Sequence, residues 1–458
     1  MEYINIAYVI SAVFFIIGIK MLSHPRSARK GNAISALGML IAILSTLYTE
    51  NILKYELIIF GLFLGSLIGF LAAKRVQMTQ MPQLVAIFNG LGGGASALIA
   101  SSEFYNIYMQ SPAKFIIVTI LLSVIIGTLT LSGSFIAFGK LQGFISGKSI
   151  SLPGHQIINF LLLIALISVG ISTLFQVSNV KFFYAIIIFS IILGITLTIP
   201  IGGADMPVVI SLLNSYSGIA ASATGFVLMN NALIISGALV GASGLILTQI
   251  MCKGMNRSIT NVIFGSIDSN VENEKSSHGQ ELNIKSYSTE EGAMIFEAAE
   301  KVIIVPGYGL AVAQAQHAVR EVAEWLESKG KKVLYAIHPV AGRMPGHMNV
   351  LLAEANIPYE QLKDLDEINP EFEDCDVALI LGANDVVNPA ARHDKTSPIY
   401  GMPILNVEDA KSTIVNKRSM NVGYAGIDND LFYRDKTSML FGDAKKVLTE
   451  IVSELKNL

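Results

Sequence analysis

Two glycines and a pair of cations carry the clearest chemical signal in this sequence. Gly307-x-Gly309-x-x-Val312 follows a short apolar run and precedes a helical stretch. Glycines between a strand and a helix let backbone amides meet a pyrophosphate, so the spacing indicates a dinucleotide site. Far downstream, Lys417 and Arg418 supply the cations that suit a phosphate. Alone, the glycine pattern is weak, and such a pair of cations is more often a solvated surface.

The sequence after the second expected strand bears on which dinucleotide would bind. An NAD site usually carries an acidic residue about 20 positions beyond the glycines, where it binds the ribose hydroxyls. Here the strand ends in Tyr335-Ala-Ile-His338-Pro339, without a carboxylate. This disfavours NAD and leaves room for NADP, with Lys417 and Arg418 as candidates for the 2′-phosphate.

Other reactive side chains are sparse. No spacing typical of a catalytic triad, a Cys/His pair or a metal site stands out, so no metal is expected. His317 is expected on a helix surface, and His155 is expected to cap a membrane helix. The two cysteines, Cys252 and Cys375, are too far apart for a disulfide framework and are expected to pack inertly. A chain without an evident acid, base or nucleophile fits direct hydride transfer, in which the cofactor does the chemistry.

The elements that must position the glycines alternate between strand and helix. We expect strands at 301–306, 332–337, 376–381, 403–406 and 413–416, and helices at 309–329, 347–356 and 443–456. This alternation predicts a Rossmann-like, doubly wound parallel sheet. A short helix capped at Thr289 should precede it, after a polar tether over 266–288.

The first 250 residues have a different composition. The chain is 52% hydrophobic and 15% charged, and most of its charged residues lie beyond this part. Nine apolar runs approach the 20 residues that span a bilayer: 4–22, 32–49, 56–73, 83–101, 115–138, 156–175, 181–200, 207–228 and 231–251. The fold class is therefore a helical membrane bundle followed by an α/β domain. Domain boundaries are expected at 1–255, 256–288 (linker) and 289–458.

Loop charges predict the orientation. One set of connections holds Lys20, Arg26, Arg29, Lys30, Lys74, Arg75, Lys140, Lys148, Lys253 and Arg257. The opposite set holds Lys54, Lys114 and Lys181. Because cytoplasmic loops carry the excess of Lys and Arg, we expect the N-terminus outside and the C-terminal domain in the cytoplasm. The net charge of −3 gives no basic footprint for nucleic acid.

Three polar residues fall within or beside the apolar runs. Asn89 and Asn214 each follow a proline by seven residues, so both amides should lie about 10 Å into their helices at 1.5 Å per residue. They could face one another or share a water, as helix–helix contacts or as parts of a transport path. Asp205 precedes a helix, where it would be an N-cap or a proton-carrying group. A stripe of hydroxyls on that helix fits a hydrated path: Ser215, Tyr216, Ser217, Ser222 and Thr224.

Seven strings together closely resemble the beta subunit of the proton-translocating nicotinamide nucleotide transhydrogenases. They are Ile201-Gly-Gly-Ala-Asp-Met-Pro-Val-Val, Leu213-Asn-Ser-Tyr-Ser-Gly, Pro306-Gly-Tyr-Gly-Leu-Ala-Val-Ala-Gln-Ala-Gln, His338-Pro-Val-Ala-Gly-Arg-Met-Pro-Gly-His-Met-Asn-Val, Gly382-Ala-Asn-Asp-Val-Val-Asn-Pro-Ala, Lys417-Arg-Ser-Met-Asn and Gly423-Tyr-Ala-Gly. The resemblance spans essentially the whole chain.

The resemblance implies an NADP(H)-binding soluble domain and a proton-conducting membrane domain in a bacterial inner membrane. A separate alpha subunit would bring the NAD(H) domain and further membrane helices, in a dimer of alpha–beta units. The implied cofactor contacts are Gly307, Tyr308, Gly309, Val312, His338, Arg343 at the pyrophosphate, Lys417 and Arg418 at the 2′-phosphate, Gly382, Ala383, Asn384 and Asp385 on the nicotinamide side, and Gly423, Tyr424 and Ala425 as a lid. Asp205 would couple the two domains, with Asn214 and Asn89 along the proton path.

Asn89 departs from many relatives, which carry histidine there. An amide does not titrate near neutral pH, so Asn89 would order water while Asp205 or a partner residue carries the charge. Two functions stay open at this point. One is hydride exchange between NAD(H) and NADP(H) coupled to proton movement, and the other is a transporter or channel with a non-catalytic NADP(H) sensor.

Overall fold

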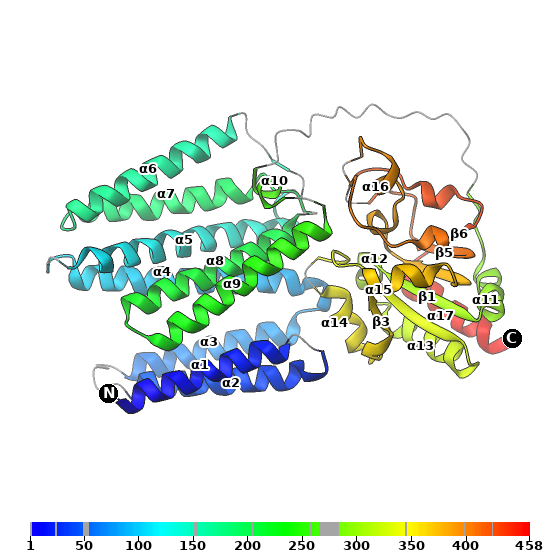
Figure 1. The fold of residues 1–458 in the computed structure, drawn as a ribbon, viewed down its shortest axis with the longest axis horizontal. Coiled ribbons are helices and arrows are strands. Elements are labelled where there is room, and N and C mark those ends of the chain that lie inside the picture. The colour runs from blue at the N-terminus through cyan, green and yellow to red at the C-terminus, as the bar shows by residue number, and fades with distance from the viewer. Residues whose placement is uncertain are drawn as a thin grey trace. The chain divides into compact units, whose positions relative to one another are not determined.

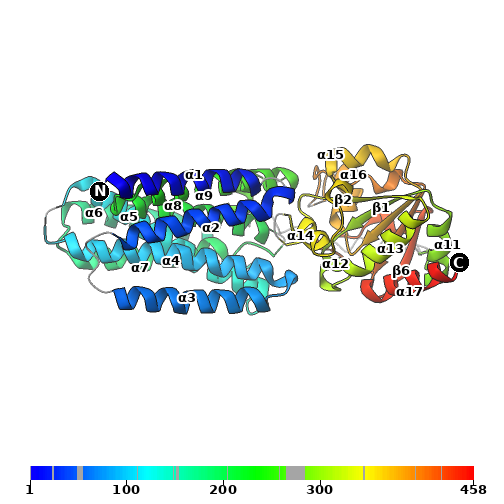
Figure 2. The same ribbon diagram turned by 90° about the horizontal axis from the view of Figure 1, so that it is seen from below.

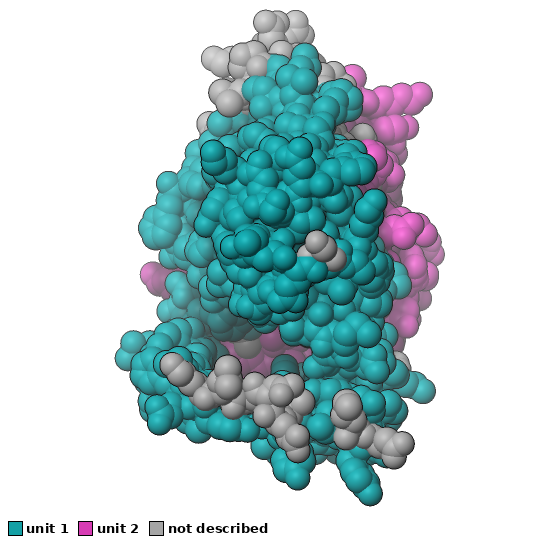
Figure 3. All heavy atoms as spheres, turned by 90° about the vertical axis from the view of Figure 1, so that its left-hand side faces the viewer, with its two compact units in different colours: residues 1–248, 262–266 teal, residues 249–261, 267–458 magenta. Residues whose placement is uncertain are grey.

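The chain forms two compact units, each described here by itself. The computed structural model describes all residues except 1, 23–24, 49–54, 111, 148, 151–153, 204, 257, 265–283, 344–345, 398 and 424. The helical unit comprises residues 1–248 and 262–266, and the sheet unit comprises 249–261 and 267–458 (Figure 3, teal and magenta). Most of the expected tether lies outside the described residues.

Within the described chain, nine helices are long and apolar enough to cross a membrane, as the sequence predicts. They are α1 (Glu2–Leu22), α2 (Pro25–Leu47), α3 (Tyr55–Arg75), α4 (Met81–Ile107), α5 (Lys114–Gln142), α6 (His155–Phe175), α7 (Val180–Thr198), α8 (Met206–Val227) and α9 (Asn231–Gly254) (Figure 1). At 1.5 Å per residue, runs of about 20 residues cover the 30 Å of hydrocarbon in a bilayer.

Helices α4, α5, α7 and α8 form the buried centre of the helical unit. Small residues allow this close packing: a Cβ added to Gly93 would lie 2.8 Å from the Gly127 carbonyl oxygen, and one on Gly218 would lie 2.5 Å from the Gly241 nitrogen. At the end where α4 finishes and α7 begins, the rings of Phe104 and Phe183 stack with centroids 4.0 Å apart. That end of the unit is closed by apolar packing.

Helix α3 differs from this centre. No described residue of α3 is buried, and Figure 2 shows it set apart from the other long helices. An apolar cavity of about 640 Å³ is lined by residues of α1, α2, α3, α4, α8 and α9 (Figure 3). The helical unit therefore leaves apolar surface that lipid or further helices must cover.

The hydroxyl stripe on α8 serves helix packing. Ser215 Oγ donates to the Gly241 carbonyl at 2.5 Å, and Ser222 Oγ donates to the Ile234 carbonyl at 3.1 Å. Thr224 Oγ1 lies 2.7 Å from Ser123 Oγ on α5. These hydroxyls bind neighbouring helices, which favours the packing interpretation over the expected hydrated path.

The sheet unit contains six parallel strands in the order β3-β2-β1-β4-β5-β6. They are β1 (Lys301–Pro306), β2 (Lys332–Ile337), β3 (Leu362–Asp364), β4 (Val377–Leu381), β5 (Ser412–Lys417) and β6 (Thr437–Phe441). Helices α11 (Thr289–Ala298), α13 (Gln316–Ser328) and α17 (Ala444–Asn457) pack together against the sheet (Figure 1). The predicted doubly wound parallel fold is confirmed.

One expected strand was wrong, and two strands were missed. Residues 403–406 form no strand: Pro403 has no N–H for a ladder, and Leu405 donates its N–H to the Val386 carbonyl and accepts the Val407 N–H rather than pairing with a strand. Their apolar character comes from burial of Ile404 and Leu405. Strands β3 and β6 were not expected.

Two helix boundaries also differ from the prediction. The expected helix at 309–329 is two helices, α12 (Tyr308–Val312) and α13, separated at Gln314, whose φ is +51°. The cap of α11 is Ser288 rather than Thr289, because Ser288 and Glu291 form a reciprocal capping box.

Candidate functional site

The glycine motif interlocks with the loop that follows β4. A Cβ on Gly307 would lie 2.5 Å from Ala383 Cα, and a Cβ on Gly309 would lie 2.6 Å from Gly382 Cα. Gly309 N–H donates to the Gly382 carbonyl at 3.0 Å, and Gly382 has φ +65°. Strands β1 and β4 are neighbours at the point where the strand order reverses, which is where ligands of doubly wound sheets bind. These glycines therefore bring two loops together at the expected edge.

The loop after β2 meets the glycine loop through stacked side chains. The Arg343 guanidinium lies 4.2 Å from the centre of the Tyr308 ring, and the His347 ring lies 6.2 Å from it. Arg343 N–H donates to His347 Nδ1 at 3.0 Å, and His347 is 1% exposed. Burial first, and then the Arg343 charge, lowers the pKa of His347, which is therefore neutral near pH 7.

His338 is turned away from the glycine loop. Its Nε2 lies 2.7 Å from the Pro403 carbonyl oxygen, and its Nδ1 accepts the Val340 N–H at 3.2 Å. Burial lowers the pKa of His338 to about 4, so the ring is neutral and both of its nitrogens bind backbone. The side chain thus ties the loop after β2 to the segment around Pro403.

The loop after β4 is tied to the expected lid. Asp385 Oδ2 accepts the Ala425 N–H at 3.0 Å, and a Cβ on Gly423 would lie 2.9 Å from Asp385 Cγ. Burial raises the pKa of Asp385, while the Ala425 N–H and the Lys417 charge act against that shift. Asn384 accepts from Asn429 Nδ2 at 3.1 Å through its side-chain oxygen. Asp385 therefore acts as a latch between the loop after β4 and the two residues Gly423 and Ala425.

The two cations at the end of β5 have different surroundings. Lys417 Nζ donates to the Asn421 carbonyl at 2.9 Å and lies 4.5 Å from the centre of the Phe432 ring. Burial lowers the pKa of Lys417, and Asp385 and Asp428 act against that shift. Arg418 is exposed, and no hydrogen bond or ion pair joins it to any described residue. The pair is thus one positioned ammonium beside one guanidinium open to solvent.

The expected soluble-site residues therefore collect on the loops after β1, β2, β4 and β5. Val312 is 39% exposed, on α12. Tyr424 lies outside the described residues. His347, Asn429 and Phe432 were not predicted individually. His347 stands in a string that the sequence singled out, whereas Asn429 and Phe432 have no spacing that would have revealed them.

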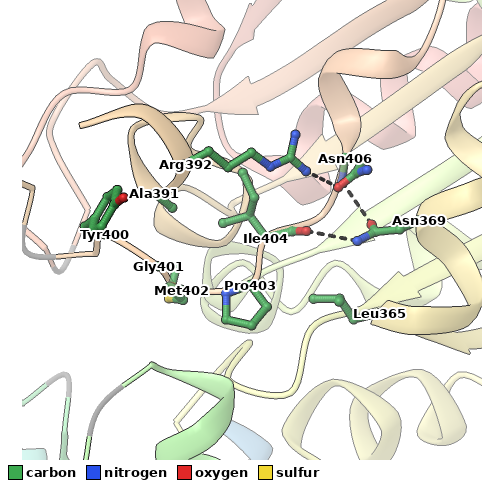
Figure 4. A pocket seen from close by; sticks show the side chains of 10 residues that line it. All are labelled: Leu365, Asn369, Ala391, Arg392, Tyr400, Gly401, Met402, Pro403, Ile404 and Asn406. Atoms are coloured by element: carbon green, nitrogen blue, oxygen red, sulfur yellow. Dashed lines mark hydrogen bonds between the residues drawn. The ribbon is translucent and has the colours of Figure 1, made fainter. Parts of the chain in front are cut away.

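A separate pocket of about 430 Å³ lies beside Pro403 (Figure 4). Its polar side chains are engaged with one another and with backbone: Arg392 bonds Asn406, and Asn369 Nδ2 donates to the Ile404 carbonyl at 3.1 Å. The pocket contains none of the residues that the sequence predicted for the cofactor.

In the helical unit, Asn89 and Asn214 lie near one carbonyl. Asn89 is 8% exposed, and its Nδ2 donates to the Ile210 carbonyl at 3.3 Å. In an α-helix that carbonyl also accepts the backbone N–H of Asn214. Asn89 thus binds the helix that carries Asn214, and among the described residues no hydrogen bond joins the two side-chain amides, which the sequence had allowed to face one another or to share a water.

Asp205 occupies the N-cap position of α8 and is 9% exposed, yet its carboxylate accepts no capping bond from the described residues of α8. This weakens the helix-cap interpretation of Asp205. His155 does not cap α6 either. Its Nε2 lies 2.5 Å from the Thr196 carbonyl oxygen on α7. That oxygen is available because Pro200, four residues later, has no N–H to donate.

Comparison with known proteins gives a consistent result. The profile described as NAD(P) transhydrogenase beta subunit matches residues 4–454. The curated protein "NAD(P) transhydrogenase subunit beta" of Rhodospirillum rubrum is 52% identical over 458 residues, which covers 98% of each chain. A second Rhodospirillum rubrum protein of the same name matches to the same extent.

Proposed function

The chain belongs to the NAD(P) transhydrogenase beta subunit family, and from that premise we propose that its sheet unit binds NADP(H) and its helical unit carries the proton. The enzyme transfers hydride reversibly between NAD(H) and NADP(H) and couples this transfer to proton movement across a membrane. The chain is a membrane protein, and as a beta subunit it works with an alpha subunit.

The observation that carries the NADP(H) assignment is the placement of charge along the carboxyl edge of the sheet. At the end of β2, where an NAD site usually has a carboxylate, His338 is neutral and has both nitrogens on backbone. At the end of β5, Lys417 and Arg418 place two cations on the loop. An ammonium and a guanidinium suit the 2′-phosphate that distinguishes NADP(H) from NAD(H).

The remaining loops have defined roles in this proposal. The Gly307–Gly309 turn lets the dinucleotide approach the backbone, and Arg343, stacked on Tyr308, faces the pyrophosphate. Asp385 holds the lid residues 423–425. The bound nicotinamide supplies or accepts the hydride, and this chain's residues orient the ring and exclude water.

We assign NAD(H) to the alpha subunit, because this chain has a single glycine fingerprint of the dinucleotide type. The exposed α3 and the apolar cavity beside it are the surfaces that further membrane helices of the alpha subunit would cover. We also propose a dimer of alpha–beta units in a bacterial inner membrane. The cation-rich connections would be cytoplasmic.

In the helical unit we propose Asp205 as the coupling carboxylate and Asn214 with Asn89 as hydrogen-bonding groups along the proton path. A proton motive force of about 100 mV contributes about 2.3 kcal/mol per charge, enough to shift the hydride equilibrium by well over tenfold. Coupling by a single carboxylate is therefore energetically sufficient.

The test is reconstitution with purified alpha subunit in proteoliposomes. NADPH-driven reduction of an NAD analogue is followed together with a pH-sensitive dye. We expect hydride transfer and proton movement to start together and to require both subunits. Nucleotide binding without hydride exchange would instead support a sensor that regulates a transporter.

A further inference from the structure

In the connection between α7 and α8, the described residues 199–203 and 205 are held by donors from α5 and from the chain that follows it. We call this connection the α7–α8 turn. Pro200 interrupts the hydrogen bonding at the end of α7, since it has no N–H. The carbonyls around it need donors from elsewhere, because unpaired backbone groups at membrane depth are costly.

Lys140, in the last turn of α5, supplies two of these donors. Its Nζ donates to the Ile199 carbonyl at 2.5 Å and to the Ile201 carbonyl at 2.8 Å, one on each side of Pro200. Ser149 Oγ donates to the Pro200 carbonyl at 2.5 Å. Three successive carbonyls are thus bound from outside the turn.

The turn also binds back to the same partner segment. Gly203 N–H donates to the Gly147 carbonyl at 2.8 Å, and Asp205 N–H donates to the Gly202 carbonyl at 3.1 Å. The Asp205 carbonyl then accepts Val208 N–H at 3.1 Å, in the first turn of α8. The backbone position of Asp205 is therefore fixed by a series of hydrogen bonds that connects the α7–α8 turn to Lys140 on α5.

Burial makes Lys140 unusual. A lysine whose only role was to orient the membrane helices through loop charge would be solvated. Lys140 is only 5% exposed. Removing an ammonium from water costs several kcal/mol unless its surroundings compensate. The C-terminal end of α7 provides such compensation, since helix carbonyls and the helix dipole present negative charge there. This arrangement requires the turn to keep one geometry around the ammonium.

We propose that Lys140 is a positioning residue for proton coupling: its ammonium fixes the α7–α8 turn that presents Asp205 at the start of α8. The proposal rests on the coupling role proposed for Asp205. Lys140 acts on the backbone on both sides of Pro200, and it needs no proton exchange of its own.

The first experiment measures the turn itself, in the full chain with its alpha subunit. Gly202 accepts a side chain, because an added Cβ would have no described neighbour within 4 Å. The native cysteines, Cys252 and Cys375, are buried, so Gly202→Cys provides a specific thiol. We expect Lys140→Met to raise its maleimide labelling rate about tenfold, as local opening does. Lys181→Met, which removes an exposed lysine from the other end of α7, should leave the rate unchanged.

The second experiment measures coupling in proteoliposomes. Lys140→Met should reduce proton movement per hydride transferred toward the level of Asp205→Asn, and Lys140→Arg, which keeps charge and donors, should restore most of it. If Lys140→Met does not assemble with the alpha subunit, Lys140→Gln takes its place, because it keeps an N–H donor without charge.

The outcomes separate the two proposals. An unchanged labelling rate in Lys140→Met would overturn the positioning role. So would full coupling in Lys140→Met when Asp205→Asn is uncoupled. A faster labelling rate together with normal coupling in Asp205→Asn would keep Lys140 as the holder of the turn and reject the role proposed for Asp205.

Discussion

The polar side chains of the two units bind different backbone groups: those of helices in the helical unit and those of loops in the sheet unit. In the helical unit, Ser215 and Asn89 donate to carbonyls of a neighbouring helix. In the sheet unit, Asp385 and His338 bind the backbone of loops. Membrane helices offer only carbonyls with spare lone pairs, whereas loops offer both N–H and C=O groups. The helical contacts hold elements together, and the loop contacts hold the loops of the candidate site together.

The two ends of the helical unit differ in the same way. One end is closed by the stacked Phe104 and Phe183. At the other end, the buried ionisable side chains of Lys140, His155 and Asp205 gather around the last turn of α7 and the turn after it. We therefore expect substitutions at the polar end to affect coupling, and substitutions at the apolar end to affect assembly.

The largest expected effect comes from Gly382→Ala. A Cβ would lie 2.7 Å from the Gly309 carbonyl carbon, at a φ of +65°. Strain and overlap should together cost about 3 kcal/mol. The control, Gly330→Ala, has φ +80° with open space around it, and should cost only the strain, about 1–2 kcal/mol. Trp325 is the single tryptophan and lies on α13, so its fluorescence reports unfolding of the sheet unit. Equal losses would show that the two loops do not interlock.

Next in size is the loss of the two cations at the end of β5. Lys417→Ala with Arg418→Ala should weaken NADP(H) binding about 100-fold, as expected for lost charge-assisted bonds, and should leave protein stability nearly unchanged. Titration calorimetry on the full chain measures the affinity. Lys395→Ala removes an exposed lysine and serves as the control. Unchanged NADP(H) affinity in the double variant would remove the 2′-phosphate assignment.

Asp205→Asn tests the polar end of the helical unit. The variant keeps the size of the side chain and removes its charge, so proton-coupled turnover should fall about tenfold or more, as expected for an essential proton-transfer group. NADP(H) binding should persist. Glu103→Gln, which removes a carboxylate near the C-terminal end of α4, is the control. Normal proton movement in Asp205→Asn would leave Asp205 without a coupling role.

A smaller effect is expected on the pH dependence of the lid. Burial raises the pKa of Asp385, so the closed lid favours the protonated carboxyl. The stabilisation of the closed lid is therefore present at low pH and is lost as pH rises through the pKa of Asp385. NADP+ release should therefore slow as pH falls through the raised pKa of Asp385. Asp385→Asn should release NADP+ at a rate that hardly changes with pH, and an unaltered pH profile would reject the latch.

The smallest effect belongs to a single contact between helices. Ser215→Ala removes the bond to the Gly241 carbonyl and should cost about 0.6 kcal/mol, the average for such bonds in membranes. The midpoint of detergent-induced unfolding, followed by circular dichroism, measures this cost. Ser243→Ala loses only a bond within its own helix and is the control. A cost of several kcal/mol for Ser215 would mean that individual polar contacts hold the helical unit together.

The sequence predicted the sheet unit well where the hydrophobic pattern of a strand and the glycines of the following turn indicated the same boundary. The strand before Gly307 and the position of Lys417 at the end of β5 agree with the prediction, because the carboxyl ends of parallel strands meet at one edge. The contacts of His338 were not predicted, because Pro403 is 65 residues away and its segment has the apolar pattern of a strand. In the helical unit, hydropathy predicted the nine spans, but a hydropathy pattern does not reveal which faces meet. For that reason Lys140 was predicted to be one of the charges of the loops between helices, whereas its side chain is buried in the structure.

The central claim is that this chain binds the 2′-phosphorylated dinucleotide. Titration calorimetry of the full chain in detergent, with NADP+ and NAD+ in parallel, tests it most directly. We expect NADP+ to bind at least about 100-fold more tightly than NAD+, a difference of about 2.7 kcal/mol. Equal affinities for the two dinucleotides would contradict it.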